Sequence, residues 1–396
     1  MPKISVIGGG IIALSTATVA AELGHQIDLR FTADHSCLGK EPEEAFLEQS
    51  LKTASGAAAA FWTPFSVGTY RKRWAIESLE RYRALAGCEE RSKTGIYLGN
   101  LNLLFSKEKE AEKSLESELW WTKLPSTWPD KQTGIRVEKL DEPVVVGEHE
   151  MPFSVRAVVP VIDMSVYLPY LVRYAQMLNV QFTPSPTTVK PSDIEDKYDG
   201  IVLCGGHDSS NVLHKGDDQP VIPLVGHLVA ASLSEGSKNR FVDDIILAHS
   251  SDVSRPAYIV RTVNHPVVLL GGTVFKTKSP AIENSLPLND LENQRIIEEC
   301  SQIAGNLTPI KSATGLQTRE GLRPYRSSVR LETCSISDKS KTPFVVNYGH
   351  GGAGISLAWG CASSALEMLE STIGLESSSD DMVDPDFIKS MPINDP

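Results

Sequence analysis

Three small residues near the N-terminus of the chain have the clearest chemical meaning. Gly8, Gly10 and Ala13 form the pattern G-x-G-x-x-A between the apolar run KISVI and a run rich in Ala and Leu. Such glycines permit a tight turn and a close approach of the backbone to a pyrophosphate. The phosphates then lie at a helix N-terminus, where free N–H groups and the helix dipole favour anions. In this context the pattern predicts a dinucleotide site, and the alternative is a glycine-rich turn without a ligand. The expected cofactor contacts are Gly8, Gly10, Ile11 and Ile12.

A dinucleotide site usually has an acidic residue about 20 residues further along, which binds a ribose hydroxyl. That position falls near Thr32 here, and the nearest carboxylate is that of Asp34. Three interpretations stay open. Asp34 reaches the ribose from a loop, Thr32 makes a weaker hydrogen bond, or Asp34 is a solvated loop residue. We take Thr32 as the predicted contact.

A second glycine-rich segment, NYGHGGAGIS at residues 347–356, also follows an expected strand (343–346) and precedes an expected helix (354–369). The chain therefore has two helix N-termini suited to anions, whereas a nicotinamide dehydrogenase needs one. Flavin enzymes of the glutathione-reductase-like class place a late one against the flavin ring, where its dipole stabilises negative charge. His350 is either catalytic or a residue that positions the backbone.

Arg323 lies in the segment EGLRPYR, shortly before the second glycine-rich segment. A guanidinium is the natural group for binding a carboxylate, because its planar fork matches both oxygens. The alternative is an ordinary surface salt bridge, and the residues alone leave the two interpretations open.

Composition excludes several classes of protein. The chain has 396 residues and a net charge of −12, and 22% of its residues are charged. An acidic chain without a long Lys/Arg run is a poor ligand for nucleic acid. The six cysteines are scattered without C-x-x-C spacing, so we expect no metal site and a reducing compartment. Residues 1–10 lack a signal-peptide pattern and no apolar run is long enough for a membrane span, so we expect a cytoplasmic protein without a membrane partner.

Short apolar runs and longer periodic runs predict strands and helices that must position these residues. Strands are expected at residues 3–7, 26–30, 144–146, 157–161, 179–183, 200–203, 221–231, 257–263 and 267–270. Helices are expected at residues 12–23, 74–86, 108–119, 164–178 and 289–300, besides the one at 354–369. Residues 37–51 are expected to form an inserted surface loop or short helix, and the polar tail from residue 376 to be frayed.

Taken together, the three motifs resemble the D-amino-acid oxidase and D-aspartate oxidase family of FAD enzymes. Further segments agree with that family in the same order along the chain: TASGAAAAFWTP at residues 53–64, IVLCGG at 201–206, PLVGH at 223–227 and PAYIV at 256–260. The resemblance extends from residue 3 to about residue 368.

The resemblance implies an α/β fold with two domains. A discontinuous, Rossmann-like FAD-binding domain of the glutathione-reductase-like kind is expected at residues 1–85, 151–215 and 310–372. A second, α+β substrate domain on a mixed or antiparallel sheet is expected at residues 86–150 and 216–309, followed by the polar tail at 373–396.

The resemblance also implies an activity and a set of site residues. The family transfers the α-hydrogen of a D-amino acid as hydride to the flavin. Oxygen then reoxidises the flavin, giving H2O2, and the imine hydrolyses to a 2-oxo acid and ammonia. By position, Arg323 binds the substrate carboxylate, the Tyr258 hydroxyl joins it, and the Gly352 carbonyl receives the amine. FAD contacts are implied at Thr53, Ala54, Ser55, Ala59, Ala60, Phe61, Gly351, Gly352, Ala353, Gly354, Ile355 and Ser356.

Departures from the family keep other functions open. The second active-site tyrosine of many members falls near Ser254, and the loop tyrosine is Ala353. The extra arginines of D-aspartate oxidases fall near Ser251 and Val274. Arg255 or Arg261 could replace them.

These changes suggest, as an alternative, a flavin amine oxidase or imine reductase acting on glycine or on cyclic or N-substituted amino acids. A nicotinamide dehydrogenase and a catalytically silent flavin scaffold are the other hypotheses. The side-chain preference and the oligomeric state are left open.

Overall fold

The computed structural model describes most of the chain: residues 1–37, 39–64, 70–88, 91–127, 134–213, 217–232, 244–249, 255–262, 267–276, 291–304 and 314–375. Ser251, Ser254 and the tail from residue 376 lie outside the described residues.

The N-terminal residues form a β-α-β unit at the centre of a parallel part of the sheet. The strand β1 (Lys3–Ile7) leads into helix α1 (Ile11–Glu22), and β2 (Gln26–Thr32) lies parallel to β1. The parallel part has the order β15-β8-β1-β2-β7, with β7 at Gln181–Ser185, β8 at Gly200–Leu203 and β15 at Phe344–His350. Such an order creates a crevice at the carboxyl ends of the strands, where α/β proteins bind ligands.

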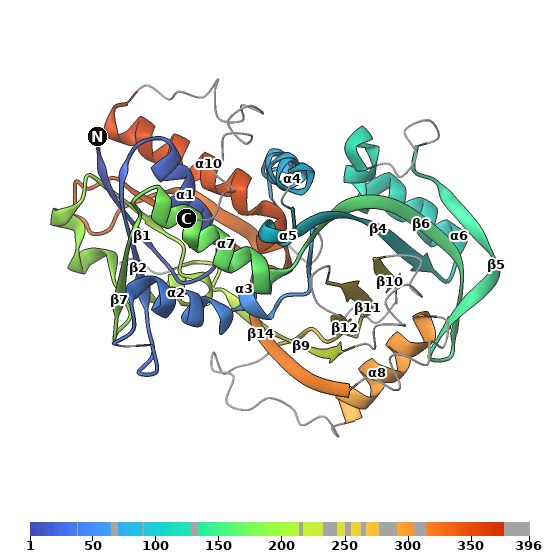
Figure 1. Ribbon diagram of the computed structural model, residues 1–396. Coiled ribbons are helices and arrows are strands. Elements are labelled where there is room, and N and C mark those ends of the chain that lie inside the picture. The colour runs from blue at the N-terminus through green and yellow to red at the C-terminus, as the bar shows by residue number, and fades with distance from the viewer. Residues whose placement is uncertain are drawn as a thin grey trace.

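An antiparallel part continues the same sheet. The long strand β14 (Thr314–Cys334) pairs with β15 on one side and with β9 (Ile222–Ser232) on the other. Figure 1 shows β14 and β9 running from the parallel part toward the opposite lobe of the molecule. The order beyond β9 is β12 (Val267–Gly271), β11 (Ala257–Arg261), β10 (Ile245–His249), β4 (Ile96–Phe105), β6 (His149–Ile162) and β3 (Ala60–Phe61). The strands β5 (Val137–Val146) and β13 (Phe275–Lys276) pair with β6 and β9.

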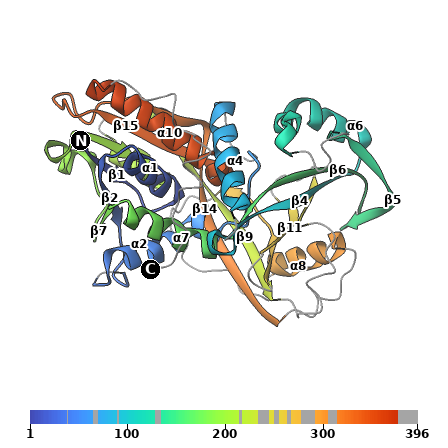
Figure 2. The same cartoon turned by 45° about the horizontal axis from the view of Figure 1, so that its top comes forward.

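Helices cover the sheet, and the apolar side of each helix faces the core. Helix α10 (Gly354–Ile373) packs against α1, and α7 (Met164–Met177) lies beside α1 in both views (Figures 1 and 2). Helix α4 (Lys72–Gly87) packs against α10, and α8 (Leu291–Ile303) covers the antiparallel part. The shorter helices are α2 (Pro42–Leu51), α3 (Ala54–Ala57), α5 (Arg91–Thr94) and α6 (Glu108–Lys113).

The predicted fold class is confirmed, since the chain is an α/β protein with a large mixed sheet. Two long strands, β4 and β14, were not predicted. The sequence of β14, TGLQTREGLRPYRSSVRLETC, has many charges, glycines and a proline, so it lacks the apolar alternation of a strand. Its pairing with neighbours on both sides fixes its conformation. The strand predicted at 343–346 is also too short, because β15 continues to His350.

Candidate active site

A cavity of about 500 Å3 lies at the carboxyl ends of β1, β8 and β15 and extends to β9, β14 and β11. Its volume falls within the range of about 300–1,000 Å3 that is usual for small-molecule and cofactor sites. The three motifs that the sequence analysis singled out therefore meet in one place, although more than 300 residues separate the first motif from the other two along the chain.

The first end of the cavity is the turn from β1 into α1. A Cβ atom at Gly8 would lie 2.4 Å from the carbonyl oxygen of Cys204, so only glycine lets these backbones approach. No side chain caps the N-terminus of α1 at Gly10, and the Ser55 hydroxyl accepts a hydrogen bond from the Ile11 N–H at 3.0 Å. The turn, together with Ile12, lines the cavity and presents the positive end of the helix dipole to it.

The structure separates Thr32 from Asp34. Thr32 lines the cavity at the end of β2. The Asp34 carboxylate instead accepts hydrogen bonds from Lys52 Nζ at 2.8 Å and from the Ser36 hydroxyl at 2.6 Å, and these bonds hold its pKa well below the usual range. Of the two residues, only Thr32 is in position to contact a ligand.

The segment at residues 53–61 lines the cavity with all but its last two residues and Gly56. Thr53 caps the short helix α3, accepting a hydrogen bond from the Ser55 N–H. Thr53, Ala54, Ser55 and Ala59 line the cavity, whereas Ala60 and Phe61 lie outside its lining, in the strand β3.

The second glycine-rich segment connects β15 to α10 beside the cavity. Gly351, Gly352, Gly354 and Ile355 line the cavity. Ala353 is fully buried behind this lining, and the Ser356 hydroxyl is likewise engaged elsewhere, because it donates to the Thr63 carbonyl at 2.8 Å. The structure thus brings most of the predicted residues of this segment to the cavity and leaves Ala353 and Ser356 outside its lining.

Arg323 lines the cavity from β14, and its guanidinium lies over the backbone of Gly226 on the neighbouring strand β9. A Cβ atom at Gly226 would be only 2.0 Å from Nη1 of Arg323, and Nη1 donates to the Thr273 carbonyl at 3.0 Å. The described residues offer the guanidinium no carboxylate in an ion pair. It is therefore held in place by neutral groups and can bind an anion in the cavity.

Tyr258, on β11, lines the same cavity as Arg323. Its ring covers Gly271, where an added Cβ atom would be 1.8 Å from the ring carbon Cζ of Tyr258. Burial raises the pKa of the Tyr258 hydroxyl, and the positive charge of Arg323 opposes this rise. The hydroxyl is protonated at neutral pH and can donate a hydrogen bond. Arg255 and Arg261, which the sequence offered as further anion-binding groups, form ion pairs with Glu292 and Asp244.

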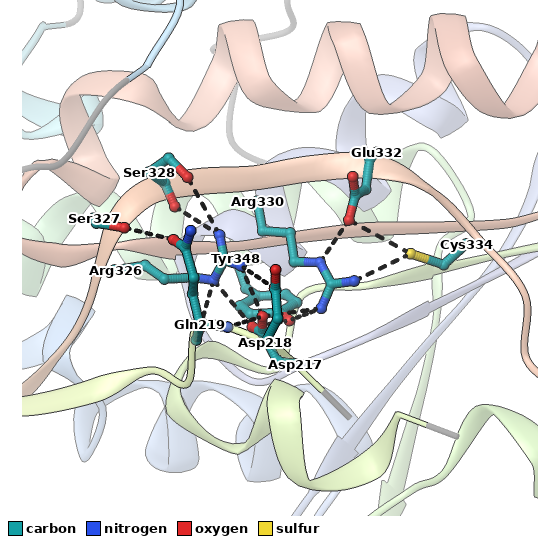
Figure 3. Close-up of polar contacts among 10 residues, drawn as sticks. All are labelled: Asp217, Asp218, Gln219, Arg326, Ser327, Ser328, Arg330, Glu332, Cys334 and Tyr348. Carbon is teal, nitrogen blue, oxygen red and sulfur yellow. Dashed lines mark hydrogen bonds and ion pairs between the residues drawn. The ribbon is translucent and has the colours of Figure 1, made fainter. Parts of the chain in front are cut away.

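A buried ion network supports the strand that carries the second motif (Figure 3). Arg326 donates to both carboxylate oxygens of Asp217, at 2.7 and 3.0 Å. The Tyr348 hydroxyl donates to Asp217 at 2.7 Å and accepts from Arg330 at 2.8 Å. Hydrogen bonds from Arg326 and Tyr348 hold the pKa of the Asp217 carboxyl well below its usual range, although burial acts in the opposite direction. The network fixes Tyr348, which lines the cavity beside the glycine-rich segment.

Some buried polar atoms along the cavity have no hydrogen-bond partner among the described residues. They are the amide oxygen and nitrogen of Asn347, the Ser209 hydroxyl and Nε2 of His350. Burial lowers the pKa of His350 to about 3, so its imidazole is neutral at physiological pH. The sequence analysis did not select Asn347 or Ser209. Asn347 lies within the quoted motif, but no spacing rule distinguishes it.

Two further observations concern the rest of the described chain. Within the described ranges, no three or more His, Cys, Asp or Glu residues form a group that could hold a metal ion. None of the described helices has both the length and the hydropathy that a membrane span requires.

Comparisons with known proteins agree with this geometry. Residues 3–368 match the family model of the FAD dependent oxidoreductases. The chain is 27% identical to a D-amino-acid oxidase of Streptomyces coelicolor, over 92% of this chain and 96% of that protein. It is 24% identical to the D-aspartate oxidase of Homo sapiens, over 94% and 95% of the two chains. Its fold is similar to that of the glycine oxidase from Bacillus cereus, with a TM-score of 0.64, 19% identity and coverage of 100% and 99%.

The chain belongs to the FAD dependent oxidoreductase family. Within that family it is similar to the amino acid oxidases, which act on CH–NH2 donors, and FAD is its cofactor. The residues present fit this group, since the tight Gly8 turn and the N-terminus of α1, whose N-cap residue Gly10 has no side chain, suit its pyrophosphate. The unpartnered buried atoms along the cavity offer it further hydrogen bonds.

Proposed function

We propose that the protein oxidises D-amino acids to 2-oxo acids, with O2 as the electron acceptor. The observation that supports this proposal most strongly is that Arg323 on β14 and Tyr258 on β11 line the same cavity as the α1 turn, from the antiparallel part of the sheet. The FAD that the family uses supplies a two-electron acceptor for the hydride from Cα. The amino acid loses that hydride and one proton from nitrogen, and water hydrolyses the resulting imine to the 2-oxo acid and ammonia. O2 takes up the two electrons and two protons as H2O2.

In this proposal Arg323 binds the substrate carboxylate. Its guanidinium is fixed by the Thr273 carbonyl and by contact with Gly226, and no carboxylate of the described residues forms an ion pair with it. A charge-assisted, two-pronged hydrogen bond both attracts the anion and sets its orientation. Because the site is partly closed from water, this interaction is stronger than on an exposed surface.

Tyr258 and Gly352 complete the orientation of the substrate. The neutral Tyr258 hydroxyl donates a second hydrogen bond to the carboxylate, and we assign the Gly352 carbonyl as the acceptor for the substrate amine. A substrate held at both its carboxylate and its amine has its Cα–H bond fixed in direction, and orientation of this kind supplies much of the catalysis. His350, which is neutral and buried, is not required as a base.

The two-domain division is part of the same proposal. We assign residues 1–85, 151–215 and 310–372 to FAD binding, and residues 86–150 and 216–309 to the substrate side. The six cysteines form no disulfide, which supports a cytoplasmic location for the enzyme.

The test is an anaerobic titration of the purified protein with a panel of D-amino acids and their L-enantiomers, followed by the visible absorbance of the flavin. We expect bleaching by D-amino acids alone, recovery in air, and one H2O2 for each turnover. The variant Arg323→Met should keep its FAD and need far higher substrate concentrations. A yellow protein that no D-amino acid bleaches would contradict the proposal.

A second candidate is oxidation of glycine or of cyclic or N-substituted amino acids. Ala353 favours it, because this small, fully buried residue stands where the family places a loop tyrosine, which implies a differently shaped pocket. Glycine, sarcosine and D-proline in the same titration separate the candidates. Bleaching by these compounds but by no primary D-amino acid with a side chain would select the second.

A further inference from the structure

Asn347, in the wall of the cavity, has two buried polar atoms without a hydrogen-bond partner among the described residues. It is fully buried in the middle of β15, and the two atoms are Oδ1 and Nδ2 of its side-chain amide. Successive side chains of a strand point to opposite faces. Val346 and Tyr348 belong to the apolar cluster on one face, so Asn347 faces the other side, with Val345.

A buried amide without partners is costly, because it has lost its hydrogen bonds to water without replacement. Such groups in folded proteins are usually explained by a ligand, a water molecule or a functional role. The unpartnered Ser209 hydroxyl, also fully buried, lines the same cavity on the short helix Gly206–Val212, which contacts β15. Two neighbouring elements thus bring residues with unsatisfied polar atoms to the wall of one cavity.

The sheet order indicates which part of the cofactor these atoms would meet. Thr32 ends β2, the Gly8 turn follows β1, β8 comes next, and then β15 with Asn347. Neighbouring strands are about 4.8 Å apart, so Asn347 lies about 10 Å from the pyrophosphate turn, in the direction of Arg323 on β14. Between its pyrophosphate and its ring, FAD has the ribitol chain, whose hydroxyls both donate and accept hydrogen bonds. An amide also does both.

We propose that Asn347, together with Ser209, binds the ribitol hydroxyls of FAD, as a contact outside the two glycine-rich segments. This inference rests on the FAD chemistry of the family and not on the substrate proposed above. Its test is therefore independent of which amino acid the enzyme oxidises.

The experiment measures the dissociation constants of FAD and of ADP for the full-length protein, by flavin fluorescence and by competition. Asn347→Leu keeps the approximate shape of the side chain and removes both polar atoms. We expect it to weaken FAD about tenfold, as two neutral hydrogen bonds predict, and to leave ADP unchanged. Ser209→Ala should weaken FAD about threefold. Ser154→Ala is the matched control, because its hydroxyl is also buried and unpartnered but lies on β6, outside the cavity lining.

The thermal midpoint of the FAD-free protein provides a second readout. Since Asn347→Leu removes two unsatisfied groups, this midpoint should stay the same or rise, whereas a merely structural asparagine would lower it. The inference would be overturned if the dissociation constant of FAD for Asn347→Leu stayed within twofold of the parent value. It would also be overturned if the binding of FAD and of ADP were weakened equally. If Asn347→Leu does not fold, Asn347→Ser replaces it, because the serine side chain is too short to reach the ribitol hydroxyls. The dissociation constants of FAD and ADP are then compared in the same way.

Discussion

A methyl group on Gly226 would occupy the space that the guanidinium of Arg323 fills. The added Cβ would lie 2.0, 2.4 and 2.6 Å from Nη1, Cζ and Nη2 of that side chain. All three atoms belong to the far end of a flexible side chain, so the backbone of β9 can stay in place while the guanidinium moves. Gly226→Ala should therefore fold and bind FAD normally, and its effect should be confined to Arg323, the group that we propose binds the substrate carboxylate.

The size of the effect follows from the displacement. Contacts of a Cβ atom below 3.0 Å do not occur in practice, so Nη1 must move by at least about 1 Å and weaken its 3.0 Å bond to the Thr273 carbonyl. A hydrogen bond to a charged group contributes about 1.5–3 kcal/mol. The loss of one hydrogen bond from the Arg323 guanidinium to the substrate carboxylate therefore predicts a decrease in kcat/KM of about 10- to 150-fold.

The assay compares kcat/KM, FAD content and thermal midpoint of Gly226→Ala with those of the parent. Gly87→Ala at the end of α4 is the control, because a Cβ there would meet no atom within 4 Å and its φ is ordinary. An unchanged kcat/KM in Gly226→Ala would refute the placement of Arg323. An equal loss in Gly87→Ala would show that the assay responds to general destabilisation.

Other predictions concern groups around the same cavity. Tyr258→Phe should keep its FAD and lose about 10-fold in kcat/KM, since one hydrogen bond to a carboxylate is removed; an unchanged value would exclude Tyr258 from substrate binding. Asp217→Asn should lower the free energy of unfolding by about 3–5 kcal/mol, because it removes the buried counter-charge of Arg326 and leaves only the exposed Asp218 at 3.6 Å. Since the pKa of Asp217 is lowered in the folded state, this difference should be constant at pH 6–8 and shrink below about pH 4; a constant difference down to pH 3 would contradict it. Burial lowers the pKa of His350 to about 3, so protonation favours the unfolded chain below about pH 6.5. The parent should lose about 2 kcal/mol more than His350→Gln between pH 7 and 5 in urea titrations, and equal losses would refute the burial of a neutral His350.

Most of the residues that the motifs selected line one cavity, because such motifs combine local backbone requirements with chemistry. The Gly8 turn, Thr32, and residues 351, 352, 354 and 355 line the cavity. Thr32 lines the cavity and Asp34 does not, because Lys52, directly after helix α2, binds the Asp34 carboxylate, and no local pattern in the sequence contains that contact. Asn347 and Ser209 were missed for a related reason. Their side chains stand out only because the folded chain buries them without hydrogen-bond partners, and burial is not visible in the sequence.

Local patterns by themselves determined the β-α-β unit and the two helix N-termini, because strand periodicity, helix periodicity and glycine requirements act over a few residues, and the fold class came from the resemblance to a known family. Tertiary structure decided the rest. Charged residues of β14 became strand only through pairing with β9 and β15, and the same pairing set the Arg323 guanidinium on Gly226. The position of Arg323 relative to Tyr258 and Thr273 depends on the registers of strands distant in sequence. Such registers depend on packing and hydrogen bonds between segments, which no local pattern contains.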